Sequence, residues 1–407
     1  MTRFHNIKIA GSRPATFAKQ TREAMTLFIL VFFIFLHPLY SEKITDRDFG
    51  FSLDIPEGFE IADYTQDGMS YIFSHPNIPV TLVMKITEEA EAKSAGEVLK
   101  KNLNKLSAKG ETDSFEWNGT NCGISNFNMT LDDNYFGWSV AAPVKIKNYY
   151  VVLLCYAPES KKGCEQFIIS TINSLCIDSE YLNTPGIITS YAFPSEGRKA
   201  VSLSIGGKQI KTSLDKVDEE ASKFVIDLEY AVLTLYGKHR MWKEAWQRYY
   251  RMIYRDNAGR LQQPAADIYK TLYPELKKSA GQDAEIKYAQ ALLSWVQNFS
   301  YERAKTKNES DFTSLPAAIN GKGSDCDSRS MLISALLNYT GIDTALLISR
   351  EYSHAMVVTD IPAPGQSFTM EDGREYLMGE TTAKVTWGMI AQDHSDRKKW
   401  IVVSFDE

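Results

Sequence analysis

The chain has 407 residues, more than one typical hydrophobic core holds, so its length predicts two or three domains. Hydrophobic residues make up 44% and charged residues 24%, which is typical of a globular protein and excludes a disordered one. The net charge of −6 argues against a nucleic-acid-binding protein, because such proteins normally present a basic surface.

Residues 1–41 are predicted to be a signal peptide or an N-terminal membrane anchor. Basic residues precede an apolar run from Leu27 to Leu36, and a polar exit follows at Ser41. The 10 residues of this run are few for a membrane span but suit the core of a signal peptide. We therefore expect an exported protein that is periplasmic, in the cell envelope or secreted. If the segment is not cleaved, it would serve as a membrane tether.

Residues 43–180 are predicted to form a small α+β domain. Segments rich in β-branched and aromatic residues alternate with two amphipathic segments. Strands are expected near residues 49–61, 69–73, 80–86, 122–131, 136–144 and 149–157, and helices near residues 92–106 and 165–175. This order predicts an antiparallel sheet with its helices on one face. The segment GFSLDIPEGFEI resembles the start of PsbP-like domains, which implies a binding or docking module and not a catalyst.

Four of the five cysteines fall within this domain. They are Cys122, Cys155, Cys164 and Cys176. In an exported protein they could form two disulfides, and Cys155 with Cys164 would make a local bridge. The sequence leaves all three pairings open, and also leaves open that the four are buried free thiols.

Residues 181–280 are predicted to be a connector that contains a hairpin and two helices. Alternating segments flank Gly206 and Gly207, the pair that a tight hairpin turn favours. Helices are expected from residue 213 to about 235 and over residues 240–254.

The second of these helices is rich in aromatic and basic residues. Four apolar residues share one of its faces: Trp242, Trp246, Tyr249 and Ile253. We expect this face in the core and the intervening basic residues in solvent, and not a membrane-binding or nucleic-acid-binding helix.

Residues 281–407 are predicted to form a third domain. It contains the fifth cysteine of the chain, Cys326, which is the strongest candidate for a catalytic residue. Gly321 and Gly323 precede it, and the apolar residues that follow predict a buried helix ending at Gly341. Cys326 is therefore expected at a helix N-terminus. Free backbone N–H groups and the helix dipole at that position lower the pKa of a thiol and make it a better nucleophile.

A base and an acid follow Cys326 on two predicted strands. The segment SHAMVV places His354 at the start of one strand, and YLMGETTAKV places Glu380 at the end of another. Neighbouring antiparallel strands would bring the two side chains together, so that the acid orients the imidazole. Asp360 and Glu375 remain alternative acids. His394 lies in a polar segment and is predicted to be in a surface loop.

The block GSDCDSRSMLISALLNYTGIDTALL, followed by SHAMVV and YLMGETTAKV, resembles the transglutaminase-like branch of the papain-like cysteine hydrolases, especially its exported bacterial members. The resemblance covers about 120 residues. It implies a papain-like fold with Cys326 as nucleophile, His354 as base and Glu380 where the family often has Asp. In relatives an upstream side chain supplies the second oxyanion donor, for which Trp295 and Gln297 are candidates.

No cofactor and no metal are expected. Asp325 and Asp327 flank the cysteine, but the sequence offers too few neighbouring ligands for a calcium or a zinc site. We interpret Asp325 as the N-cap of the helix and Asp327 as a complement to its dipole.

Two functions compete. The first is an exported transglutaminase-like acyl-transfer enzyme, a peptide or amide hydrolase or a transamidase, that acts through a thioester on Cys326. Its substrate would be a protein, a peptide or a cell-wall peptide. The alternative is a non-catalytic transglutaminase-like binding or scaffold protein of the cell envelope. A redox protein is less well supported, because the chain has no C-x-x-C pair.

Overall fold

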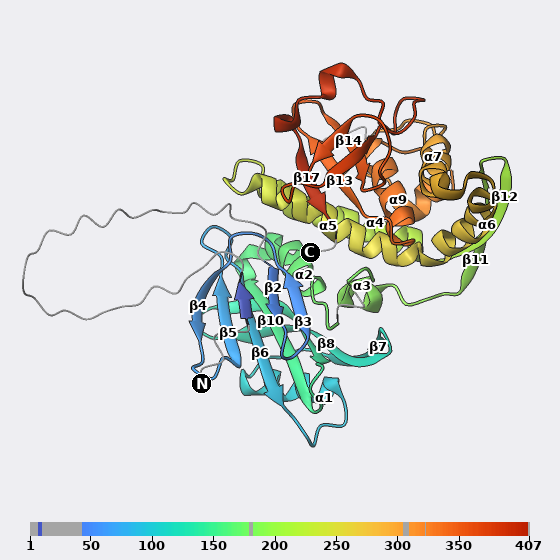
Figure 1. Cartoon of the computed structure of the whole chain (residues 1–407). Coiled ribbons are helices and arrows are strands. Elements are labelled where there is room, and N and C mark those ends of the chain that lie inside the picture. The colour runs from blue at the N-terminus through green and yellow to red at the C-terminus, as the bar shows by residue number, and fades with distance from the viewer. Residues whose placement is uncertain (1–6, 10–42, 179–181, 304–308, 322, 406–407) are drawn as a thin grey trace, which may run out of the picture.

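The computed structural model describes residues 7–9, 43–178, 182–303, 309–321 and 323–405, and it has the predicted α+β class (Figure 1). Apart from one short strand, the predicted signal or anchor segment lies outside the described residues. Among the described residues, no helix has the length and apolar character that a membrane span requires.

A seven-stranded antiparallel sheet forms the centre of the N-terminal domain. Its strands in spatial order are β4 (Glu60–Tyr64), β5 (Ser70–Ser74), β6 (Thr81–Glu88), β10 (Tyr149–Pro158), β9 (Asn134–Pro143), β8 (Thr120–Thr130) and β7 (Thr112–Trp117). A second sheet contains β1 (Ile7–Ile9), β2 (Lys43–Asp46) and β3 (Phe51–Asp54). The sequence predicted most of these strands and missed β1, β2 and β7.

The two helices of this domain, α1 (Ala95–Lys105) and α2 (Glu165–Asn173), lie on opposite faces of the large sheet, so the prediction of one covered face was wrong. Val152 and Leu154 of β10 belong to the hydrophobic cluster of α1, and Val151 and Leu153 belong to that of α2. The reason is that β10 is apolar at successive positions, so both faces must be covered.

All five cysteines of the chain are free thiols. The local bridge considered between Cys155 and Cys164 is therefore absent, and of the alternatives left open the free thiols are observed. Burial raises the pKa of the Cys122 thiol to about 12 and also raises that of Cys155. Such thiols are poor nucleophiles at neutral pH.

The connector contains the predicted hairpin and more helix than expected. Its elements are α3 (Ile187–Ala192), β11 (Arg198–Ile205), β12 (Lys208–Asp215), α4 (Asp218–Thr234), α5 (Trp242–Arg260) and α6 (Gln262–Ala280). Gly206 and Gly207, both with positive φ, form the hairpin turn, as predicted. The sequence missed α3 and α6.

The C-terminal segment forms a five-stranded antiparallel sheet with helices packed against it. Its strands in spatial order are β15 (Ser367–Thr369), β16 (Glu375–Gly379), β14 (His354–Thr359), β13 (Thr344–Ser349) and β17 (Ile401–Ser404). Its helices are α7 (Ala284–Val296), α8 (Leu315–Ile319) and α9 (Cys326–Asn338). One hydrophobic cluster runs from Val201 to Phe405, so the connector and this segment share a core across the boundary predicted at residue 280.

Helix α5 lies between the N-terminal domain and the C-terminal sheet (Figure 1). Of its predicted core face, Tyr249 and Ile253 are buried and Trp246 packs against the core, whereas Trp242 is only half-buried. Of its basic residues, Lys243 is exposed as predicted, but two arginines are not. Arg248 is 1% exposed and Arg255 is 9% exposed. The guanidinium of Arg255 donates to the carbonyl oxygens of Ser174 (2.8 Å) and Leu175 (2.5 Å). The prediction failed at these two arginines because the other domain covers them.

Arg248 is the centre of a buried polar network that joins the two halves. Its Nη1 donates to Oε2 of Glu229 on α4 (2.7 Å), and its Nη2 donates to Oγ of Ser170 on α2 (3.0 Å). Its Nε donates to the carbonyl oxygen of Asp54 in β3 (2.7 Å). Arg251 pairs with the Asp54 carboxylate (2.8 Å).

Replacement of Arg248 by Met is expected to lower the free energy of unfolding by about 3–5 kcal/mol, because it leaves the Glu229 carboxylate buried without its cation. Urea-induced unfolding measures the loss. The matched control is Lys223→Met, which removes an exposed cation paired with Asp227 on α4 and should cost less than about 1 kcal/mol. Equal costs for the two variants would contradict a structural role for the Arg248 network.

Glu57 lies 1% exposed near this network, and neither of its carboxyl oxygens has a hydrogen-bond partner within the part of the chain that the structure describes. Burial raises its pKa from 4.5 to about 8, although Arg248 and Arg251 oppose the change. The folded protein thus holds this proton to a higher pH than the unfolded chain does. The contribution of protonated Glu57 to the stability of the folded protein is therefore fully present below pH 4.5, and it is lost as the pH rises towards 8.

Between pH 5 and pH 8, the wild-type protein is expected to lose stability relative to Glu57→Gln, by up to about 1.4 kcal/mol per pH unit. The variant keeps a neutral side chain at every pH. Urea unfolding of both proteins across this range measures the difference, and Glu60→Gln at an exposed neighbouring position is the control. A difference that does not change with pH would contradict the raised pKa.

Candidate active site

Cys326 is the first residue of α9, as predicted, with Asp325 as the N-cap. Oδ1 of Asp325 accepts from the backbone N–H of Ser328 (2.9 Å) and from its hydroxyl (2.5 Å). The Ser328 hydroxyl in turn accepts from the backbone N–H of Thr313 (2.8 Å), so the cap also holds the segment before α8. The start of the helix, and with it the position of the thiol, is fixed by these hydrogen bonds.

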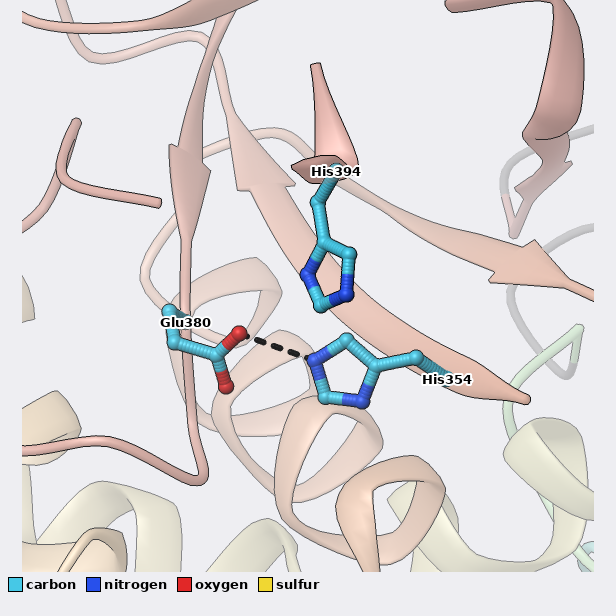
Figure 2. A group of neighbouring side chains, drawn as sticks. All are labelled: His354, Glu380 and His394. Atoms are coloured by element: carbon cyan, nitrogen blue, oxygen red, sulfur yellow. Dashed lines mark hydrogen bonds and ion pairs between the residues drawn. The ribbon is translucent and has the colours of Figure 1, made fainter. Parts of the chain in front are cut away.

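His354 and Glu380 form a hydrogen-bonded pair (Figure 2). Strands β14 and β16 are antiparallel neighbours, His354 begins β14, and Glu380 directly follows β16. Nε2 of His354 lies 2.8 Å from Oε2 of Glu380. A carboxylate can only accept, so Nε2 carries the hydrogen, and in the neutral ring Nδ1 is the basic nitrogen.

The carboxylate of Glu380 is held from several sides. The backbone N–H and the hydroxyl of Thr382 donate to Oε1 at 2.7 and 2.6 Å. Burial by itself would raise the pKa of Glu380, but the hydrogen bond and charge of His354 and the bonds from Thr382 lower it to about 2. The carboxyl is therefore ionised throughout the physiological pH range, the state that orients an imidazole.

Two buried side chains hold the backbone around Glu380. Nε2 of Gln297 donates to the carbonyl oxygens of Glu380 (2.8 Å) and Val385 (3.0 Å). Arg329 of α9 donates to the carbonyl oxygens of Phe299 (2.9 Å) and Thr381 (3.3 Å). Sequence reasoning missed this role of both residues, because their partners lie far away along the chain.

Gln297, one of the two candidates for the second oxyanion donor, is therefore not available for that role. Its amide hydrogens are used by two backbone carbonyls. The other candidate, Trp295, packs edge-on against Phe299 with ring centroids 5.0 Å apart. Neither side chain is among the described residues that line the cavity at Cys326.

Cys326 and His354 line one cavity of about 290 Å³. The backbone N–H of Ala355, next to His354, also interacts with the thiol. Apolar and aromatic side chains of α4 and α5 form one wall of the cavity: Tyr230, Leu233, Trp246, Tyr249 and Tyr250. The connector thus contributes to the site, which the sequence did not predict.

Acidic side chains lie beside the Cys326 thiol, whereas the sequence predicted that the positive end of the helix dipole would dominate. The Sγ–H of Cys326 donates to Oδ1 of Asp327 (3.1 Å), and the hydroxyl of Tyr250 donates to the other oxygen of Asp327. Burial of Cys326, the nearby carboxylates of Asp327 and Asp325 and this hydrogen bond raise the pKa of the thiol. The N–H of Ala355 acts in the opposite direction.

The prediction of a lowered thiol pKa was therefore wrong. A helix N-terminus stabilises an anion by about 0.3–1 kcal/mol. A full charge about 4 Å away acts with about 4 kcal/mol at an effective dielectric constant of about 20. The burial of Cys326, which is the largest cause, and the carboxyl group of Asp327, whose own pKa burial also raises, thus outweigh the helix dipole. In this structure the thiol of Cys326 keeps its proton at neutral pH.

The two alternative acids lie apart from His354. Glu375 accepts hydrogen bonds from the hydroxyls of Ser367 (2.5 Å) and Thr369 at the exposed edge of the sheet. Asp360 follows β14 at the end opposite His354, near Asp343. Of the three acids considered, the structure places Glu380 beside the imidazole.

His394 is the residue of this region that sequence reasoning set aside. It ends the short turn η5 (Gln392–His394), yet its ring centroid lies 5.1 Å from that of His354 (Figure 2). Trp400 fixes the turn, because its Nε1 donates to the carbonyl oxygen of His394 (2.9 Å). The two histidines are 40 positions apart in the sequence, and no local pattern predicts their contact.

Comparisons with known proteins give only distant structural similarity. No protein-family model and no curated protein matches the chain. The chain is similar to cyanobacterial PsbP (CyanoP) from Synechocystis sp. PCC 6803, with 13% identity and a TM-score of 0.28, over 33% of this chain and 91% of that protein. It is also similar to the Ran-binding protein Mog1p of Saccharomyces cerevisiae, with 9% identity and a TM-score of 0.27, over 34% of this chain and 96% of that protein.

A protein from Bacteroides thetaiotaomicron VPI-5482 is similar over 82% of this chain and 84% of its own length, with 10% identity and a TM-score of 0.17. The chain is thus a distant structural match to the PsbP/Mog1-like fold over about a third of its length. None of the comparisons supports the transglutaminase-like resemblance.

Replacement of Asp327 by Asn is expected to lower the pKa of the Cys326 thiol, because it removes the carboxylate that contacts Sγ. Each unit of change raises the thiolate fraction about tenfold. The rate of alkylation of Cys326 by iodoacetamide at pH 8, followed by mass spectrometry, should therefore increase. Asp227→Asn, at an exposed position on α4, is the control and should react like the wild type. An unchanged or slower rate in Asp327→Asn would contradict this account of the thiol.

Proposed function

We propose that this protein is an exported transglutaminase-like cysteine acyl-transfer enzyme, in which Cys326 is the nucleophile, His354 the base and Glu380 the orienting acid. One observation carries the proposal. A cysteine at a helix N-terminus lines the same cavity as an imidazole whose other nitrogen is hydrogen-bonded to a carboxylate. Nucleophile, base and orienting group in this order are what thiol-based acyl transfer requires.

The first half of the proposed reaction forms a thioester. Nδ1 of His354 takes the proton of the Cys326 thiol as Sγ attacks the carbonyl carbon of an amide or ester. The tetrahedral intermediate collapses with cleavage of the bond to the amine or alcohol, which leaves with the proton from His354. Backbone N–H groups at the start of α9 would stabilise the oxyanion.

The second half transfers the acyl group. Water or an amine loses a proton to His354 and attacks the thioester carbonyl, and the C–S bond breaks while Sγ regains the proton. Water gives hydrolysis and an amine gives transamidation, and both use the same residues. The proposed substrates are proteins, peptides or cell-wall peptides outside the cytoplasmic membrane.

The raised thiol pKa has a mechanistic consequence within this proposal. The resting site holds a protonated thiol, so proton transfer to His354 accompanies the attack on the carbonyl. Glu380 then contributes by holding the imidazole in the tautomer with a basic Nδ1 and by stabilising the imidazolium that forms. Loss of this orientation would lower the rate without removing the nucleophile.

The alternative is a non-catalytic binding or scaffold protein of the cell envelope. The 3% exposure of Cys326 and its raised thiol pKa favour this reading, since both reduce the reactivity of a thiol. The hydrogen-bonded His354–Glu380 pair beside the same cavity favours the enzyme.

Reaction of the full chain with p-nitrophenyl acetate distinguishes the two functions. An enzyme should show a burst of nitrophenolate and an acetyl adduct on Cys326, identified by mass spectrometry. Cys326→Ala should abolish both, and His354→Ala should slow the burst by about 10²–10⁴-fold. His239→Ala, at a site away from the cavity, is the control and should match the wild type. A wild-type protein that forms no adduct on Cys326 would favour the scaffold.

A further inference from the structure

We propose that His354, Glu380 and His394 form a binding site for one divalent transition-metal ion, with zinc as the best match. The three side chains each offer a ligand atom, and these atoms all lie within 4.8 Å of one another. Figure 2 shows the three side chains converging, with His394 beside the His354–Glu380 hydrogen bond. This site goes beyond the proposed acyl transfer, in which His394 has no part.

The set of donors selects the class of ion. Two imidazole nitrogens and one carboxylate oxygen are a ligand set of zinc sites that keep a fourth position open. Calcium and magnesium are excluded as preferred ions, because they take oxygen ligands. Copper prefers nitrogen ligands as zinc does and is the main competitor.

A second observation points to a missing partner at His394. Its Nδ1 is buried and has no hydrogen-bond partner among the described residues. A buried ring nitrogen without a partner costs free energy, and a metal ion bonded to the nitrogen removes this cost. A bound ion would thus supply the partner that the described protein groups do not give to Nδ1 of His394.

The surroundings of the three residues are suited to hold a metal ion. The Tyr352 ring lies 4.9 Å from that of His394 and 5.3 Å from that of Trp400, and the Trp400 ring lies 6.3 Å from that of His354. These aromatic walls restrict the rotation of both imidazoles. The hydrogen bond from Trp400 to the His394 carbonyl fixes the backbone of the turn. Such supporting contacts typically change metal affinity by about 10–100-fold.

Metal binding would compete with acyl transfer, a consequence that rests on the proposed function. Nε2 of His354 and Oε2 of Glu380 are 2.8 Å apart and share one hydrogen. An ion between them replaces this hydrogen and holds the imidazole as a ligand. The ring can then no longer accept a proton and return it with the help of Glu380. Zinc would therefore act as a reversible inhibitor at the base and not at the thiol.

Zinc titration of the metal-free full chain, in competition with a chromogenic chelator, tests the site without any activity assay. The wild type should bind one equivalent that Mg²⁺ does not displace. Affinity should fall by at least about tenfold in His394→Ala and in His354→Ala. His239→Ala removes a histidine far from the site and should bind like the wild type. Equal affinity in wild type and His394→Ala, or no binding by the wild type, would overturn the proposal.

Cobalt titration tests which atoms bind the ion. Nitrogen and oxygen ligands give d–d bands without a strong thiolate-to-cobalt charge-transfer band, which is the expected result. A strong charge-transfer band would place the ion on cysteine sulfur and overturn the assignment. These readouts are independent of the acetyl adduct on Cys326. Zinc binding without adduct formation would sink only the acyl-transfer proposal, and adduct formation without zinc binding would sink only the metal site.

Discussion

The buried ion pair of Arg248 with Glu229 is the interaction on which the arrangement of the molecule depends. Both charges are removed from water, so each needs its partners in place. Further partners of Arg248 come from the N-terminal domain, through the carbonyl of Asp54 and the hydroxyl of Ser170. Movement of the domain away from α5 would leave these groups without hydrogen bonds. The N-terminal domain is thereby held against the helix that also forms a wall of the candidate site.

Helix α5 contacts both the N-terminal domain and the candidate site at Cys326. Arg248, Arg251 and Arg255 contact the N-terminal domain. Tyr250, which lies between the first two in the sequence, donates a hydrogen bond to Asp327 beside the Cys326 thiol. The carboxylate next to the Cys326 thiol is thus hydrogen-bonded to a helix that also contacts the N-terminal domain. The N-terminal domain affects the environment of Cys326 although it contributes no residue to the cavity.

The imidazole of His354 belongs to both proposals, acyl transfer and metal binding. In the proposed acyl transfer, Glu380 on Nε2 prepares His354 to act as a base through Nδ1. In the proposed metal site, the same Nε2 and the nearby His394 offer ligands to the ion. Both uses need the pairing of β14 with β16 and the aromatic contacts of Trp400. Acyl transfer and metal binding are therefore proposed as alternative states of one arrangement.

The sequence by itself determined the elements and their order. It predicted the strands of the large sheet except β7, the hairpin at Gly206 and Gly207, the start of α9 at Cys326 and the strands that carry His354 and Glu380. These features depend on periodicity, turn residues and capping, which act over a few neighbours. Only the tertiary structure decided the rest: helices on both faces of the sheet, buried arginines on α5, a thiol pKa that is raised, and His394 beside His354. Each of these is set by partners distant along the chain, whose burial and charge no local pattern encodes.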